Sequence, residues 1–117
     1  MTPEGRVKAK VRATIEQFDG SYQCWPVFRG LGKTTVDLLG CYRGRFFGVE
    51  TKAPGKKPTL RQQMSLKEIA AAGGETFVID DVDCPELLRL EAWLIQLREN
   101  VHDVAHIPRD TVHRRRI

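Results

Sequence analysis

The chain has 117 residues, of which 41% are hydrophobic, and it carries a formal net charge of +4. This length predicts one domain spanning residues 1–117, and the moderate positive charge favours polyanionic partners. No apolar run approaches the ~20 residues that a membrane-spanning helix needs, and basic residues within 6–12 interrupt the region where a signal peptide would be apolar. We therefore expect a cytoplasmic protein with no membrane contact.

The N-terminal segment predicts a helix. Thr2 is placed to cap it and Pro3 suits its first position. Apolar residues then recur at helical spacing, at Val7, Val11, Ile15 and Phe18. Glu4 falls in the same stripe, so its carboxylate is expected to point toward the buried side of the helix end. The alternative is a first-turn acid that complements the helix dipole.

Residues 22–28 predict the first β-strand. Pro26 lacks the N–H that a central strand needs, so an edge position or a bulge is expected. Trp25 is predicted to lie in the core.

Residues 30–35 resemble a phosphate-binding P-loop, but two features exclude one. A P-loop requires a glycine five positions before Gly32, where this chain has Val27, and a helix after the threonine, where a hairpin is predicted. We interpret the segment as a flexible basic loop in which Arg29 and Lys33 can contact phosphate.

Residues 36–52 predict a β-hairpin whose connection is centred on residues 43–44. In that register Asp37 lies directly opposite Glu50, with Cβ atoms roughly 4.5–5.5 Å apart, where like charges destabilise the pair. A divalent cation between the carboxylates would remove this repulsion. Because strand side chains alternate, Lys52 projects on the same side as Glu50.

These groups suit phosphodiester hydrolysis, which needs a metal ion and an activated water. Asp37 and Glu50 offer the hard oxygen ligands that Mg²⁺ prefers, with a backbone carbonyl near Thr51 as a further ligand. Lys52 would orient or help to deprotonate the water. Solvated charges on a surface strand are the alternative interpretation of this motif.

The next segments predict a strand–helix–strand unit. Residues 53–58 form a turn-rich basic loop, and Thr59 caps a helix that ends at residues 73–74. Residues 76–79 follow as a short strand. A right-handed crossover would place it parallel to the second strand of the hairpin.

Asp83 or Cys84 is expected to open the last helix. Its apolar face comprises Leu87, Leu90, Trp93, Leu94, Leu97 and Val101, broadened by Leu88 and Ile95. Such a face could cap the sheet, which we favour, or form a dimer contact as well.

Beyond this helix, residues 103–117 are expected to form a flexible basic tail. His102 and His106 have a spacing that can bind metal, but solvated histidines are the simpler interpretation. The three cysteines, Cys24, Cys41 and Cys84, lack zinc-site spacing and are expected to be buried free thiols.

Basic residues bracket the hairpin and predict a track for phosphate groups. The predicted DNA contacts are Arg29, Lys33, Lys56, Lys57, Arg61, Arg114, Arg115 and Arg116. The last three could instead form a merely soluble chain end. A non-catalytic nucleic-acid-binding module that uses the basic loops alone is the alternative to an enzyme.

The polar residues also match a family pattern. Glu4 in the first helix, Asp37 and Glu50-Thr51-Lys52 in the hairpin, and Gln62 in the next helix resemble the PD-(D/E)XK nuclease superfamily. Within it, the chain is similar to the small stand-alone VRR-NUC nucleases of phages and bacteria. The likeness extends from Thr2 to about Ile79, with Val36 at the usual proline position.

The resemblance implies an α/β fold with a restriction-endonuclease-like core, in which helices flank a mixed central β-sheet. It implies a DNA endonuclease that uses Mg²⁺, with Mn²⁺ as substitute, in a bacterial or phage-infected cell. Some members of this size act as homodimers on branched DNA such as Holliday junctions.

The resemblance also implies a role for each matched residue. Asp37 and Glu50 would bind the metal, and Lys52 would assist the water. Glu4 would contribute to the metal or water shell. Gln62 would hold the site geometry near Lys52, and the neighbouring Gln63 matches the pattern less well.

Overall fold

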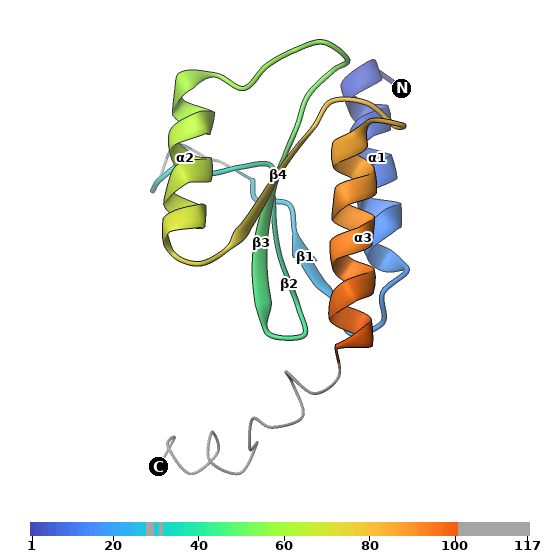
Figure 1. The fold of residues 1–117 in the computed structure, drawn as a ribbon. Helices are drawn as coiled ribbons and strands as arrows, with labels where there is room; N and C mark the ends of the chain where they lie inside the picture. Colours follow the sequence, from blue (N-terminus) through green and yellow to red (C-terminus); the bar gives the residue numbers. More distant parts are fainter. Residues whose placement is uncertain (28–29, 31, 101–117) are drawn as a thin grey trace.

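A computed structural model describes residues 1–27, 30 and 32–100. The elements in chain order are α1 (Pro3–Glu16), β1 (Tyr22–Cys24), β2 (Leu38–Tyr42), β3 (Arg45–Thr51), α2 (Leu60–Ala71), β4 (Glu75–Ile79) and α3 (Pro85–Glu99). The sheet order is β1-β2-β3-β4, antiparallel except for the parallel β3–β4 pair. Helix α2 lies on one side of the sheet, and α1 and α3 lie on the other (Figure 1). The predicted α/β class, with a mixed sheet flanked by helices, is confirmed.

The β2–β3 hairpin has the predicted register, with Leu38 opposite Val49 and Tyr42 opposite Arg45. Its two-residue connection uses positive φ angles, 50° at Arg43 and 77° at Gly44, as a type I′ turn requires. Asp37 immediately precedes β2. Extending the register by one pair beyond Leu38 and Val49 therefore places Asp37 opposite Glu50.

The return from β3 to β4 also follows the sequence prediction. Thr59 caps α2 by accepting a hydrogen bond from the Gln62 amide, and Gly73, with φ of 96°, follows the helix end. Strand β4 is parallel to β3, with Val78 opposite Glu50. The carboxyl end of β3 therefore lies in the interior of the sheet.

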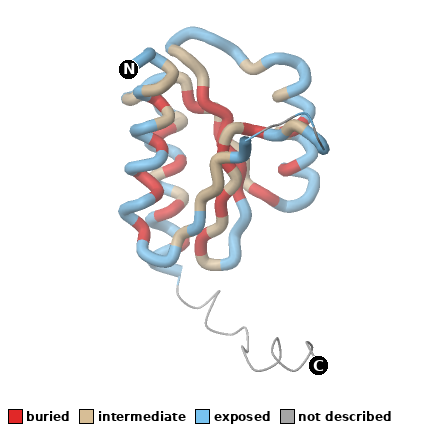
Figure 2. The backbone as a smooth tube through the Cα atoms, turned by 180° about the vertical axis from the view of Figure 1, so that it is seen from behind, coloured by how far each residue is buried: buried red, intermediate tan, exposed pale blue. Residues whose placement is uncertain are grey.

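The hydrophobic core lies between the sheet and the helices α1 and α3, where Figure 2 shows buried segments facing one another. Phe47 packs edge-on against Trp93, with ring centroids 5.5 Å apart. The apolar face of α3 therefore caps the sheet, as favoured from the sequence. Leu88 and Ile95 lie outside this contact, with exposed fractions of 62% and 38%, and Val101 is beyond the described residues.

Strand β1 is shorter than predicted, because it ends at Cys24 and does not extend through residue 28. Pro26 lacks an N–H for continued pairing. The edge position of β1 is confirmed. Trp25 is half-buried against the core, and its indole N–H donates to Gln23 Oε1 at 2.9 Å.

The three cysteines are free, as predicted, but each is only half-buried. The prediction that they are buried was therefore wrong.

Across the part of the chain that the structure describes, no helix has the length and apolar character needed to cross a membrane.

Candidate metal centre

Glu50 is the most unusual residue of the sheet. It lies in β3 with an exposed fraction of 0%, and neither carboxylate oxygen has a hydrogen-bond partner among the described residues. Phe47 and Val49 face the core, so strand alternation directs Glu50 toward the α2 face. An uncompensated buried carboxylate costs several kcal/mol, so this group requires either a proton or a cation.

Close packing of α2 explains part of this burial. A Cβ atom at Gly48, two residues earlier on the same face, would lie 2.7 Å from Ile69 Cδ1 of α2. Glycine at this position therefore lets the helix approach the sheet. A side chain there would require the end of the Ile69 side chain to move away from the sheet.

Asp37 is held across the end of β3. Its Oδ2 atom accepts hydrogen bonds from the Thr51 amide at 3.0 Å and from the Thr51 hydroxyl at 2.8 Å. The carboxylate is thus fixed next to Glu50, and only one of its oxygens takes part in these two bonds. This position agrees with the strand pairing predicted from the sequence.

The two carboxyl groups titrate in opposite directions. Burial, reinforced by the neighbouring Asp37 carboxylate, raises the pKa of Glu50 to about 8, while Lys52 acts in the opposite sense. Burial also opposes ionisation of Asp37, but the Glu50 carboxyl, the Thr51 donors and the Lys8 ammonium together lower its pKa. Near neutral pH, without a metal ion, Glu50 therefore keeps its proton while Asp37 is ionised.

The donor set fits a divalent cation. Carboxylate oxygens are the ligands that Mg²⁺ prefers, and a cation between Asp37 and Glu50 would compensate the two partnerless oxygens of Glu50. Within the described ranges, no group of three or more His, Cys, Asp and Glu side chains could hold a metal ion. Water, a substrate phosphate and a backbone carbonyl such as that of Thr51 would have to complete the coordination.

Glu4 is not part of such a cluster. Its carboxylate forms an ion pair with Lys8, one helical turn later, at 3.4 Å. Lys8 in turn lies near enough to Asp37 to contribute to the lowering of its pKa. Lys8 was not predicted as part of the site, although its spacing of four residues from Glu4 is a signal for such a pair.

Lys52 follows the last residue of β3. Its backbone amide donates to the Ile79 carbonyl of β4 at 3.0 Å, which fixes the chain beyond the strand. The side chain is half-buried, and its positive charge acts on the Glu50 carboxyl. The structure therefore brings Asp37, Glu50 and Lys52 together at one end of the hairpin.

Gln62 has a structural role that was not predicted. Its Oε1 atom accepts a hydrogen bond from the Thr59 amide at 2.8 Å, which completes a capping box at the start of α2. The Thr-x-x-Gln spacing could have revealed this from the sequence. Gln63 instead donates from Nε2 to the Pro58 carbonyl at 3.1 Å. No hydrogen bond to Lys52 is made by either glutamine.

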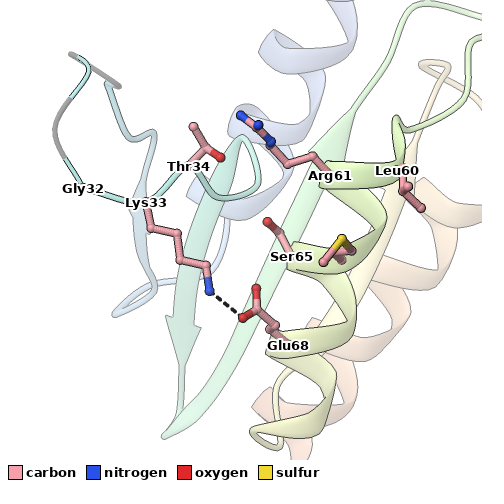
Figure 3. Close-up of a pocket in the computed structure, with 8 residues that line it drawn as sticks. Gly32, Lys33, Thr34, Leu60, Arg61, Ser65 and Glu68 are labelled. Carbon is pink, nitrogen blue, oxygen red and sulfur yellow. Dashed lines mark hydrogen bonds and ion pairs between the residues drawn. The ribbon is translucent and has the colours of Figure 1, made fainter.

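The basic residues are divided among several places. Lys33 forms an ion pair with Glu68 of α2, and Arg61 lies on the same helix (Figure 3). Lys56 and Lys57 are exposed in the loop between β3 and α2. The predicted contacts Arg29, Arg114, Arg115 and Arg116, together with His102 and His106, fall outside the described residues.

No protein-family model and no curated protein matches this chain. A solved structure described as a VRR_NUC domain matches with a TM-score of 0.59 and 24% sequence identity, over 86% of this chain and 98% of that chain. At this level of identity, the similarity shows a common fold.

Proposed function

We propose that this chain is a DNA endonuclease that hydrolyses phosphodiester bonds with Mg²⁺, or with Mn²⁺ as substitute. The observation that carries the proposal is the carboxylate of Glu50, which is fully buried without a hydrogen-bond partner beside Asp37. The common fold with a VRR_NUC domain supports a nuclease-type protein. The sequence resemblance to VRR-NUC nucleases agrees with it.

In this proposal Asp37 and Glu50 hold the metal, with the backbone carbonyl of Thr51 as a further ligand. The bound ion would polarise the scissile phosphoryl oxygen and offset the charge that develops on it. Lys52 orients the attacking water and helps to remove its proton. The Thr51 donors keep Asp37 in position, because its Oδ2 atom accepts from both of them.

Two further residues support this arrangement. Glu4 acts on the metal or water shell from the start of α1 by holding Lys8 beside Asp37. Gln62 fixes the first turn of α2 through its capping bond to Thr59.

The proposed substrate is DNA, with branched forms such as Holliday junctions preferred. Phosphate contacts would come from Lys33, Lys56, Lys57 and Arg61, together with Arg29, Arg114, Arg115 and Arg116. A homodimer would place two metal centres on two strands of one junction. Binding through these residues should weaken as salt is raised, because each phosphate contact releases counterions.

A panel of labelled DNA substrates tests the proposal. Four-way junction, flap, nicked and plain duplex DNA are incubated with the protein in Mg²⁺, Mn²⁺ or EDTA. We expect cleavage only with metal and most rapidly on branched DNA. Asp37→Asn should abolish it, while Asp19→Asn, which changes an exposed acid elsewhere, should cleave as the wild type does.

Two outcomes would contradict the proposal. Undiminished cleavage by the folded Asp37→Asn variant would refute the metal centre. Salt-sensitive DNA binding that is indifferent to metal, with no cleavage of any substrate, would instead identify a non-catalytic nucleic-acid-binding module.

A further inference from the structure

A cleft lies between residues 32–34 and helix α2 (Figure 3). Its volume is about 630 Å³, within the range of roughly 300–1,000 Å³ that is typical of ligand sites. The lining residues are Gly32, Lys33, Thr34, Leu60, Arg61, Met64, Ser65 and Glu68. Asp37, Glu50 and Lys52 do not belong to this lining, so the cleft is distinct from the metal centre.

The helix side of the cleft combines apolar and polar groups. Met64 is 58% exposed and Leu60, one turn earlier at the rim, is 73% exposed. Met64 is large, flexible and polarisable, so it adapts to flat apolar ligands. Ser65 and Thr34 add hydroxyl groups, and Arg61 extends from α2 toward Thr34 (Figure 3). An unpaired nucleobase, with its apolar faces and polar edge, matches this combination.

The charges of the cleft favour a phosphate-bearing ligand. Arg61 is exposed and forms no ion pair with the residues that the structure describes. Lys33 pairs with Glu68, but their side chains are 71% and 56% exposed. Exposed ion pairs contribute only about 0–1 kcal/mol, so a phosphate group can compete for Lys33 at little cost.

The cleft shares two lining residues with a second hollow that Asp37 lines. This second hollow, of about 240 Å³, is lined by Pro26, Val27 and residues 33–37, so it includes Asp37 of the metal centre. Lys33 and Thr34 line both spaces. This arrangement would let a nucleotide strand run from Asp37 along residues 33–37 to the cleft on α2.

The geometry points to the cleft as a binding site for an unpaired DNA strand that leaves the scissile position, with one base against Met64 and its phosphates at Arg61 and Lys33. The inference rests on the proposed function for the identity of the strand. Bases in an intact duplex remain stacked and cannot enter a cleft, so the site selects DNA that carries a single-stranded segment. It thereby supplies a physical reason for a preference for flaps and open junctions.

Binding without cleavage tests the site independently of catalysis. Fluorescence anisotropy in EDTA would measure the affinity of the full chain for a labelled single-stranded oligonucleotide and for the same sequence as a duplex. Stacking of a base on a side chain contributes about 1–3 kcal/mol for aromatic groups. For the aliphatic Met64 we expect the lower end, so Met64→Ser should weaken single-strand binding roughly 3- to 10-fold.

The matched control is Leu88→Ser on α3, because Leu88 is similarly exposed, at 62%, and does not line the cleft. It should bind as the wild type does. An oligonucleotide with abasic positions keeps the phosphates and lacks the bases. On this ligand, Met64→Ser and wild type should bind equally, because the side chain has no base to contact.

Arg61→Ala tests the phosphate part of the site, with Lys67→Ala, an exposed α2 residue outside the cleft, as its control. Only the Arg61 variant should reduce the slope of log affinity against log salt, by about 0.7 for one lost single-strand contact. Thermal unfolding of each variant would verify that it is folded.

The outcomes separate this inference from the proposed function. Wild-type single-strand affinity in both Met64→Ser and Arg61→Ala would overturn the site, even if the protein cleaves DNA. An equal loss on duplex and single strand would overturn it as well. Selective loss in both variants would support the site even if no cleavage were found and the nuclease proposal failed.

Discussion

The two faces of the central sheet differ in whether their buried side chains have suitable partners. On the α1 and α3 face, apolar side chains such as Phe47 and Val49 are fully buried against helices. On the α2 face, one position away, the equally buried Glu50 has no hydrogen-bond partner among the described residues. The first face stabilises the fold, whereas the second buries the Glu50 carboxyl, which lowers the stability of the fold when it is ionised. Such a contrast within one strand is typical of a binding site built into a stable scaffold.

The largest effect on stability is expected at the core face. Phe47→Ala should lower the free energy of unfolding by about 3–5 kcal/mol, because it removes a buried ring that packs against Trp93. Phe46→Ala is the matched change on the other face, where the side chain is 42% exposed. Urea unfolding should show a clearly smaller loss for Phe46→Ala. Equal losses would contradict the assignment of the core to one face.

The next largest effect concerns Glu50 and pH. Because its pKa is raised from 4.5 to about 8, the folded state retains a proton that the unfolded state releases between these values. Stability of the metal-free protein should therefore fall as pH rises from 4.5 to 8, by an amount on the order of 3–5 kcal/mol. The lowered pKa of Asp37 acts oppositely, and its contribution is lost as the solution becomes acidic.

Glu50→Gln tests this prediction, since glutamine keeps the shape of the side chain and cannot ionise. In EDTA the variant should lose most of the decline between pH 4.5 and 8 and should exceed the wild type in stability at pH 8. Unfolding by urea at a series of pH values would measure this. A wild-type decline that persists in Glu50→Gln would assign the pH dependence to another group.

Metal should narrow this difference in stability, because it binds the wild type alone. A ligand present at 100 times its Kd stabilises the folded state by about 2.7 kcal/mol. Mg²⁺ or Mn²⁺ should therefore raise the Tm of the wild type and leave that of Glu50→Gln unchanged. The same rise in the Asp19→Asn control would show that the exposed Asp19 carboxylate is not responsible. A rise in Glu50→Gln equal to that of the wild type would contradict a role for this carboxylate.

A smaller effect is expected from the hydroxyl of Thr51, which donates to Asp37 at 2.8 Å. Thr51→Val removes this donor and preserves the shape of the buried side chain. Hydrogen bonds to charged groups contribute about 1.5–3 kcal/mol, and one donor, the amide, remains. We expect a stability loss at the lower end of this range and weaker metal binding, whereas Thr51→Ser should retain both. Calorimetric titration and urea unfolding would provide the two measurements.

Much of the fold could be predicted because local chemistry specifies it. The turn at Arg43 and Gly44 fixes the register of the hairpin, and the register in turn places Asp37 opposite Glu50. The complete burial of Glu50 could not be predicted, because it depends on how closely α2 packs over the strand. That distance is set by Gly48 and Ile69, which are far apart in the sequence.

Helix side chains were harder to assign than strand side chains. Glu4 and Gln62 fit a family pattern, but the pattern does not show which neighbour each side chain contacts. In the structure Glu4 pairs with Lys8, and Gln62 caps its own helix. Both contacts are local and have recognisable spacings, so they compete with the longer-range roles that the resemblance implied.

Direct titration of the protein with Mn²⁺ by isothermal calorimetry tests the central claim, which is that Asp37 and Glu50 bind a metal ion together. The wild type should bind Mn²⁺ with a measurable heat, and this heat should disappear in Asp37→Asn and in Glu50→Gln but persist in Asp19→Asn. Unchanged Mn²⁺ binding in folded Asp37→Asn and Glu50→Gln proteins would contradict the claim.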